Sequence, residues 1–234
     1  MGKSFQRIDN RPQTVLEFVR SDIWKRIVTH KYPPGYPLRE EWLQREFGAS
    51  RGPIREALRM LLKGGLVEYE SRKGFRVTEY GCEEIITVYQ LRADLEGKVL
   101  LDLEKVKVES LVVWLKEQVE VLNDLARRGD VDGYFFENIE FHNAIIRTCE
   151  NRPLRRMAQS VNEMSLPTRY LLIHKEGTLD RSMSGHLRLL EALRSQQHQR
   201  ACDLAREEIL DNMGKVMAMI YTSVADRDNT TRVG

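Results

Sequence analysis

The sequence predicts a mainly α-helical chain in two parts: three short helices with a β-hairpin, followed by an all-helical bundle. Apolar residues recur at helical spacing over most of the chain, which is typical of amphipathic helices. Two short β-prone runs, 66–70 and 75–78, are joined by turn residues, as in a hairpin. After the second run the pattern is wholly helical. We therefore expect a first domain at 1–80, an all-helical domain at 81–225 and a flexible tail at 226–234.

The composition is that of an ordinary globular protein. Its 234 residues are 41% hydrophobic and 31% charged, enough for two modest domains that each bury a core. There is no apolar run of about 18 residues and no secretory signal, so we expect no membrane span. The three cysteines are odd in number and widely spaced, which predicts neither a disulfide framework nor a Cys-x-x-Cys metal site. These features favour a reducing cytoplasmic location.

The charge is distributed unevenly, although the net charge is only +2. Residues 1–80 contain 16 Lys and Arg against 10 Asp and Glu, whereas residues 81–234 contain 21 against 25. A basic first domain beside an acidic second one suggests that the first meets a polyanion. An ordinary solvated surface can carry the same imbalance. The motifs of the first domain therefore have to show whether it binds a polyanion.

The first domain is predicted to begin with a helix near residue 14. Thr14 and Glu17 have the spacing of a capping box, in which two side chains satisfy free amides at a helix start. An apolar stripe follows at steps of four residues: Val15, Val19, Ile23 and Ile27. The prolines within 32–37 cannot continue this helix, because they lack an amide donor. We expect a second helix at 39–47 and a third at 50–64.

The third helix has one apolar face and one basic flank. At about 100° per residue, its buried stripe is Ile54, Ala57, Leu58 and Leu61. Arg51, Arg55 and Arg59 lie together on the flank. An arginine fork matches a phosphate or the O6/N7 edge of guanine, and the first turns of a recognition helix reach the base edges. The alternative is a solvated face whose arginines pair with Glu46 or Glu56.

Three helices and a hairpin in this order predict a winged helix-turn-helix, a DNA-binding fold. Arg72 and Lys73 at the hairpin tip are placed for flanking phosphate or the minor groove, and Gly74 lets the backbone come close. Ser50 can cap the third helix, with Pro53 in its first turn. The expected DNA-binding residues are Ser50, Arg51, Gly52, Arg55, Arg59, Arg72, Lys73 and Gly74.

A longer motif around the third helix resembles the signature of the GntR family of bacterial regulators. It comprises Phe47-Gly-Ala-Ser-Arg-Gly-Pro-Ile-Arg-Glu-Ala-Leu58, with Pro34-Gly-Tyr-Pro-Leu38 before it and Gly65-Leu-Val67 after it. The family's usual form is Gly-Val-Ser-Arg-Thr-Pro-Val-Arg-Glu-Ala-Leu, and the likeness covers roughly 15–78. It implies that Arg51 and Arg55 contact DNA, with a wing contact near Lys73. Gly52 lacks the hydroxyl that often touches phosphate, and the DNA-contacting arginine of an earlier helix is not carried over to Glu41.

The first helix of the second domain has an arginine inside its apolar stripe. Arg92 falls among Ile85, Val88, Leu95 and Val99, and a guanidinium that faces a core needs an anionic partner. Glu96, one turn on, can be that partner in an internal ion pair. Alternatively, Arg92 binds the carboxylate of a small molecule, which its bidentate geometry suits. The helices expected here are 83–104, 108–128, 131–149, 152–175, 181–196 and 199–222.

Four more polar side chains face inward on three later helices. Asn138 and His142 lie one turn apart in an apolar stripe, His186 lies among leucines, and Glu208 shares a face with alanines and a leucine. If they converge, they are plausible ligands for zinc, nickel or manganese. Taken singly, each has a simpler explanation, because a lone core histidine usually bonds a neighbouring carbonyl and Glu208 can be exposed.

The second domain resembles the FCD effector domain of FadR-type GntR regulators. Tyr89-Gln-Leu-Arg-Ala-Asp-Leu-Glu96 is similar to its opening helix, and the likeness continues over roughly 85–222. Many FCD domains bind a metal through Asp-x-x-x-His and two further histidines. The resemblance places these ligands at Asn138, His142, His186 and Glu208. Two of the four are substituted, which implies weaker affinity or a different metal.

Together the resemblances imply a homodimeric transcription regulator, usually a repressor, that binds a palindromic DNA operator. A small carboxylate effector, bound by Arg92, Asn138, His142 and His186 with or without the metal, would release it. One alternative keeps the DNA-binding role with a metal-free pocket for an acyl-CoA-like ligand. The other is a metal-dependent hydrolase at the His/Glu cluster. The chain lacks a His-Glu-x-x-His motif, a nucleophile elbow and a phosphate-binding glycine loop, so we expect no enzyme.

Overall fold

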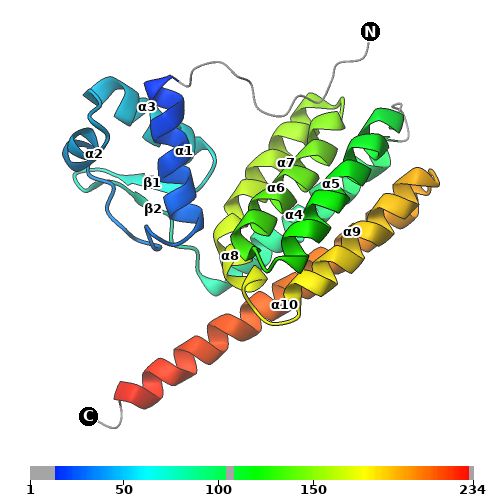
Figure 1. Cartoon of the computed structure of the whole chain (residues 1–234). Coiled ribbons are helices and arrows are strands. Elements are labelled where there is room, and N and C mark those ends of the chain that lie inside the picture. Colours follow the sequence, from blue (N-terminus) through cyan, green and yellow to red (C-terminus); the bar gives the residue numbers. More distant parts are fainter. Residues whose placement is uncertain (1–13, 104–107, 232–234) are drawn as a thin grey trace. The chain divides into compact units, whose positions relative to one another are not determined.

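The computed structural model describes residues 14–103 and 108–231, with side chains as far as residue 222. The chain divides into two compact units, residues 1–80 and 81–234 (Figure 1). In the described part, helices dominate both units and the only sheet is a two-stranded one in the first. None of the described helices is both long and apolar enough to cross a membrane.

The first unit has the element order predicted for a winged helix-turn-helix. Its elements are α1 (Val15–Val28), α2 (Glu40–Phe47), α3 (Arg51–Lys63), β1 (Val67–Glu70) and β2 (Gly74–Val77). Both α1 and α2 pack on α3. The predicted stripes meet in the core, where Val19, Ile23, Ile54 and Leu58 are fully buried. Val15 was also expected there, but it is 54% exposed because it is the first residue of the helix.

Local interactions define the start of α1 and the β1–β2 hairpin. The predicted capping box is present: the Glu17 amide donates to Thr14 Oγ1 at 3.2 Å, and the Thr14 amide donates to Glu17 Oε2 at 2.9 Å. The strands β1 and β2 pair antiparallel, with Val67 opposite Val77. Their connection is tight, because Arg72 and Gly74 adopt left-handed backbone conformations, with φ of 72° and 87°.

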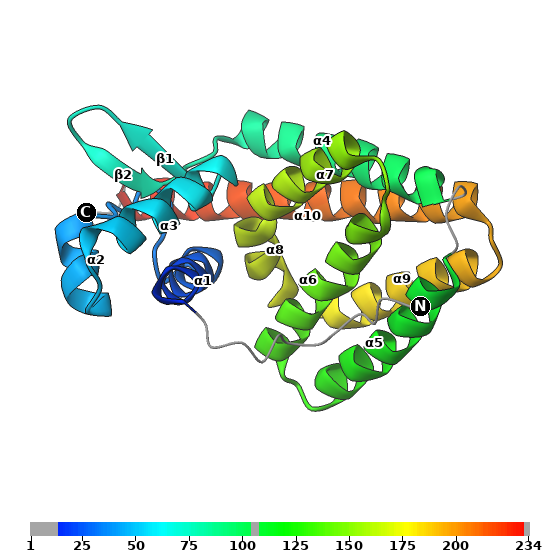
Figure 2. The same cartoon turned by 90° about the horizontal axis from the view of Figure 1, so that it is seen from above.

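The second unit is a helical bundle in which α4 and the long α10 lie side by side (Figure 2). Its helices are α4 (Cys82–Asp102), α5 (Glu109–Arg127), α6 (Val131–Thr148), α7 (Arg152–Met164), α8 (Leu166–Ile173), α9 (Thr178–Arg194) and α10 (His198–Thr231). Helix α5 packs against α6 and α9, and α4 also packs against α7. The polar side chains predicted to face inward therefore come from helices that enclose one interior.

Two of the expected helix boundaries are wrong. The single helix expected at 152–175 is divided at Ser165, whose Oγ donates to Asn162 O at 2.8 Å. Pro167 lies in the first turn of α8, where it needs no amide donor, so a new helix starts there instead of the old one continuing. The last helix runs through Thr231, into the tail expected at 226–234, of which residues 232–234 lie outside the described part.

A glycine allows α4 and α10 to approach closely. A Cβ atom at Gly97 would lie 2.9 Å from Cys202 Sγ and 3.1 Å from Arg206 Cγ. Cys202 is 5% exposed and its short side chain has little freedom to move. The absence of a side chain at Gly97 is therefore a condition of this helix pairing.

We expect Gly97→Ala to lower the free energy of unfolding of the second unit by about 1–2 kcal/mol, because overpacking outweighs the gain in helix propensity. Denaturant unfolding followed by circular dichroism measures this change. Gly214→Ala on α10 is the matched control, since a Cβ there meets no atom within 4 Å, and it should be stabilising. Equal stabilisation by both substitutions would contradict the packing argument.

Candidate nucleic-acid interface and ligand cavity

The first turns of α3 present a basic face to solvent. Helix α2 ends at Gly48 with a left-handed φ of 58°, and Ser50 occupies the N-cap position of α3 without a side-chain capping bond. The side chains of Arg51, Arg55 and Arg59 are 68%, 41% and 55% exposed. The opposite face carries the predicted stripe, and all four of its residues are buried: Ile54, Ala57, Leu58 and Leu61. The three side chains are thus accessible from solvent on this face.

One carboxylate from α2 pairs with two of these arginines. Glu40 Oε2 lies 2.8 Å from Arg51 Nε, and Glu40 Oε1 lies 3.8 Å from Arg55 Nε. Of the partners considered from the sequence, Glu46 pairs instead with Arg26, and Glu56 is 4.0 Å from Arg59. Sequence reasoning missed Glu40, because no local spacing brings a residue of α2 onto α3. The Glu40 carboxylate holds Arg51 and Arg55 in one orientation.

The hairpin tip lies across a groove from α3. The groove is lined by Arg39 and Glu41 of the α2 region, by Arg51, and by Arg72, Lys73 and Gly74 of the hairpin. Arg72 and Lys73 are exposed, and Lys73 Nζ is 2.7 Å from Glu70. Gly52 is exposed and has open space where a Cβ would stand. Of the predicted DNA-binding residues, four line this groove and four do not. The first four are Arg51, Arg72, Lys73 and Gly74, and the others are Ser50, Gly52, Arg55 and Arg59.

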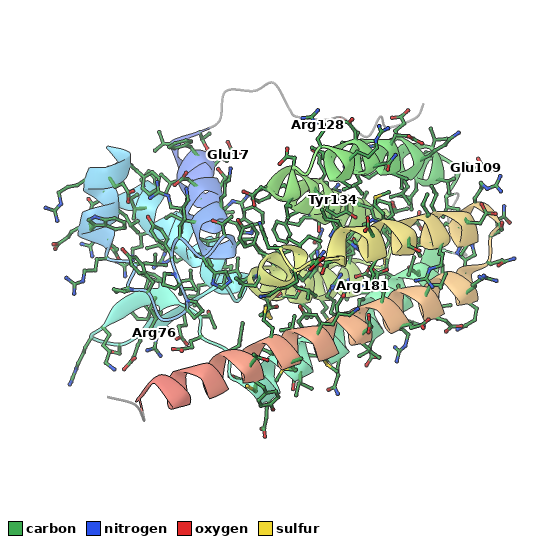
Figure 3. The ribbon with its side chains drawn as sticks, turned by 60° about the horizontal axis from the view of Figure 1, so that its bottom comes forward. Glu17, Arg76, Glu109, Arg128, Tyr134 and Arg181 are labelled. Atoms are coloured by element: carbon green, nitrogen blue, oxygen red, sulfur yellow. The ribbon has the colours of Figure 1, made fainter. Side chains whose placement is uncertain are left out.

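The second unit encloses a cavity of about 230 Å³ between α4, α6, α8, α9 and α10. Figure 3 shows the side chains packed between these helices, with Tyr134 and Arg181 labelled. Arg92, Asn138, His142 and Glu208 line the cavity, as expected of a binding site. His186 is buried beside it, with its ring centroid 4.4 Å from that of Phe141 and Nδ1 3.4 Å from the Tyr134 hydroxyl.

A chain of buried charged and polar groups starts at Arg92. Arg92 Nη2 lies 3.3 Å from Glu96 Oε2, and Glu96 Oε1 lies 2.8 Å from His142 Nδ1. Burial alone would raise the pKa of Glu96, but the facing His142 and Arg92 lower it to about 2. Burial lowers the pKa of His142 despite the facing carboxylate. The predicted Arg92–Glu96 pair is present, and Arg92 also faces the cavity, so the two interpretations of this arginine are compatible.

A second buried arginine was missed from the sequence. Arg169 on α8 is 8% exposed, lines the cavity and donates through Nη1 to Asn162 Oδ1 at 2.8 Å. Burial and the nearby Arg92 lower the pKa of Arg169 to about 9. With α8 read as part of one long helix, nothing in the sequence indicated that Arg169 turns inward.

Glu208 enters the cavity from α10. Its carboxylate packs directly against Gly185 of α9, where a Cβ atom would collide with it. Burial, together with repulsion from Glu96, raises the pKa of Glu208 to about 7. A carboxyl group that is partly protonated near neutral pH can both donate and accept hydrogen bonds.

The predicted metal ligands lie near one another, with the ring centroids of His142 and His186 5.5 Å apart. Among the described residues, no three His, Cys, Asp or Glu side chains are placed to hold a metal ion. His142 Nδ1 faces Glu96, which leaves Nε2 as its other ring nitrogen, and His186 Nε2 and Asn138 Oδ1 are buried without a hydrogen-bond partner among the described groups. The aspartate and third histidine of the family pattern are Asn138 and Glu208 here, and two guanidinium groups already bring positive charge to the cavity.

Comparison with protein families decides what the chain is. Residues 16–77 match the model described as bacterial regulatory proteins, gntR family, and residues 87–211 match the FCD domain. The chain belongs to the GntR family. Members of this family are transcription regulators and not enzymes, and the same holds for this chain. Its C-terminal domain is an FCD domain.

Its relatives are regulators of the same kind. This GntR regulator is 27% identical over 197 residues to an uncharacterised HTH-type transcriptional regulator of Bacillus subtilis (strain 168), covering 83% of this chain and 87% of the relative. It is 27% identical over 182 residues to the gluconate operon transcriptional repressor of the same organism, covering 76% and 74%. The structure of Escherichia coli McbR/YncC has the same fold, with a TM-score of 0.72, 20% identity, and coverage of 91% and 100%.

We expect Glu208→Gln to change how stability depends on pH. The groups that face Glu208 are Glu96 and Arg92 of α4, Arg169 of α8 and Arg188 of α9. Because the pKa of Glu208 is raised from 4.5 to about 7, the folded state binds more protons than the unfolded state between these values. The wild-type free energy of unfolding should therefore fall relative to the variant as pH rises from about 4.5 to about 7.

The difference should level off above that range, at on the order of 3 kcal/mol. Urea unfolding at a series of pH values measures it. Glu207→Gln, one position earlier and exposed, is the matched control. A difference between wild type and Glu208→Gln that stays constant with pH would contradict the shifted pKa.

Proposed function

We propose that this protein is a repressor that binds a palindromic operator as a homodimer, with α3 of each protomer in the major groove. The observation that carries the proposal is the exposed pair Arg51 and Arg55 on the first turns of α3. A guanidinium fork there suits the O6/N7 edge of guanine. Arg72 and Lys73 at the hairpin tip suit flanking phosphates or the minor groove. Since its target is chromosomal DNA, we infer that it acts in the cytoplasm.

The proposed homodimer and the proposed palindromic operator follow from the same two-fold symmetry. A two-fold symmetric dimer presents two equal recognition helices, so its preferred operator has two inverted half-sites. Names of relatives support repression: the gluconate operon repressor of Bacillus subtilis and the galactonate operon repressor of Escherichia coli are both repressors. We propose the same direction of regulation here.

A small carboxylate is the effector that the cavity favours. Its volume of about 230 Å³ lies below the range of about 300–1,000 Å³ typical of sites for drug-sized ligands, so it suits a small molecule better than an acyl-CoA. The buried guanidinium of Arg92 suits a carboxylate. Effector binding would release DNA by favouring one of two conformations of the dimer, to the extent that its affinity differs between them.

Arg51→Ala and Arg55→Ala should each weaken operator binding by about 1–3 kcal/mol, because each removes one bidentate contact from the groove. An electrophoretic mobility shift with the promoter beside the protein's own gene measures this. Both side chains are exposed, so the melting temperature should not change. Arg194→Ala, on the exposed face of α9, is the control. Unchanged operator affinity in both variants would remove the assignment of α3 as recognition helix.

Glu40→Gln should reduce sequence discrimination more than affinity. The substitution removes a negative charge near the phosphates, which strengthens non-specific binding, and it frees Arg51 and Arg55 from their common orientation. We therefore expect the ratio of operator to non-specific affinity to fall by about tenfold. Competition with unrelated duplex DNA at fixed salt measures the ratio. Glu41→Gln on the same helix is the control, and an equal loss there would assign the effect to charge alone.

A further inference from the structure

The groove of the first unit, about 900 Å³ in volume, has cationic side chains on both of its walls. One wall consists of α2 and the first residue of α3, and the other consists of the hairpin. Two carboxylates line the groove, those of Glu40 and Glu41. Five cationic residues line it as well: Arg39, Arg45, Arg51, Arg72 and Lys73. The excess of positive charge favours an anionic ligand that is long enough to touch both walls.

Two of the cations on the α2 wall have no carboxylate partner. Arg39, at the N-cap of α2, and Arg45 are exposed, and neither forms an ion pair with any residue that the structure describes. Arg45 Nε donates only to the backbone oxygen of Glu41, at 3.4 Å. Arg51, by contrast, already faces Glu40 at 2.8 Å. Arg39 and Arg45 therefore have their full charge available for an anion.

Between the walls, the groove has an aromatic surface. Tyr69 of β1 is 53% exposed, although Val67 and Val77, further from the hairpin tip, are buried. The Tyr69 ring meets Phe75 of β2 edge to face, with centroids 4.9 Å apart, and both rings line the groove together with Trp42. An exposed ring in a cationic groove suits a ligand with apolar surface between its anionic groups. A sugar-phosphate backbone has this chemistry, because deoxyriboses alternate with phosphates.

The position of the groove matches one strand of duplex DNA. The proposed function places α3 in the major groove, and a single sugar-phosphate strand separates the major groove from the next minor groove. Arg51, the first residue of α3, and Arg72 of the hairpin tip line opposite walls. A strand that passes between them has α3 on its major-groove side and the hairpin tip on its minor-groove side.

We propose that one strand of the operator passes through this groove, with Arg39 and Arg45 bound to its phosphates and the Tyr69 ring packed on a deoxyribose. This inference deepens the proposed function and rests on it. The three residues read no base. They position α3 on the duplex and add affinity that does not depend on sequence. The hairpin tip then binds in the minor groove, and not on flanking phosphates.

Arg39→Ala and Arg45→Ala test the phosphate contacts. Each variant should bind the promoter beside the protein's own gene and an unrelated duplex more weakly by the same factor, about threefold to fivefold at about 100 mM salt. Each should also reduce by about one the slope of log affinity against log salt concentration, because one fewer counterion is released. Fluorescence anisotropy over a series of salt concentrations measures both quantities.

Lys63→Ala is the matched control for these two variants. Lys63 is exposed on the last turn of α3, has no ion-pair partner among the described residues and does not line the groove. Its replacement removes the same charge from the same unit. A loss in Arg39→Ala and Arg45→Ala no larger than in this control would overturn the phosphate contacts. A loss for the promoter but not for the unrelated duplex would overturn them too, because it would indicate base contacts.

Hydroxyl-radical cleavage tests the sugar contact, since the radical attacks deoxyriboses and is blocked where protein covers them. The wild type and Tyr69→Phe should protect the sugars of one strand between the major-groove site and the flanking minor groove. Tyr69→Thr, which keeps a β-branched residue in the strand, should lose this protection and retain the rest of the footprint. An unchanged melting temperature shows that the hairpin of this variant is intact.

Three results would overturn the assignment of Tyr69. They are full protection in Tyr69→Thr, loss of protection in Tyr69→Phe, and no protection of these sugars by the wild type. The last two do not depend on how well Tyr69→Thr folds. They therefore keep the proposal open to refutation if that variant is unstable.

The same DNA-binding measurements separate this inference from the proposed function. Weaker promoter binding in Arg51→Ala and Arg55→Ala, with wild-type binding in Arg39→Ala and Arg45→Ala, would refute the groove proposal alone. The reverse result would refute the assignment of α3 as recognition helix and leave the groove as a DNA-binding surface. A wild-type protein that binds neither the promoter nor the unrelated duplex at about 50 mM salt would refute both.

Discussion

The second unit depends on how a single buried carboxylate is shared. Glu96 lies 3.3 Å from Arg92 and 2.8 Å from His142, so it connects α4 with α6 and neutralises one guanidinium. Such a pair contributes little net stability when made, but it is expensive to break, because either partner alone would be a buried unpaired charge. The cost fixes Arg92 at the cavity wall.

The first unit also has one carboxylate that faces two cationic side chains, but this arrangement lies at the surface and is easily broken. Glu40 also joins two cationic side chains, Arg51 and Arg55, but these are 68% and 41% exposed. An ion pair in contact with water contributes only about 0–1 kcal/mol. A phosphate or a guanine edge can therefore replace the Glu40 carboxylate at small cost. The pairing of Glu40 is therefore exchangeable with another anion, whereas the pairing of Glu96 is held in place by its burial.

Residues whose role follows from local periodicity were predictable from the sequence. The Thr14 capping box, the buried stripe of α3 and the Arg92–Glu96 pair all depend on spacings of three or four residues, and all are present. Arg169 and Glu40 were not predictable, because each acts across helices and no spacing reports which helices meet. The break at Ser165 added to this, since it turns α8 and with it Arg169 toward the cavity.

The metal site illustrates the limit of a motif. Positions 138, 142, 186 and 208 were expected to converge on a cation; three of them line the cavity and His186 is buried beside it. Replacing an aspartate by Asn138 removes a negative charge, and the buried Arg92 and Arg169 add positive charge at the same cavity. The motif reports only the residue types at four positions. The charge around them depends also on Arg169, which lies on another helix and which no spacing connects with the motif.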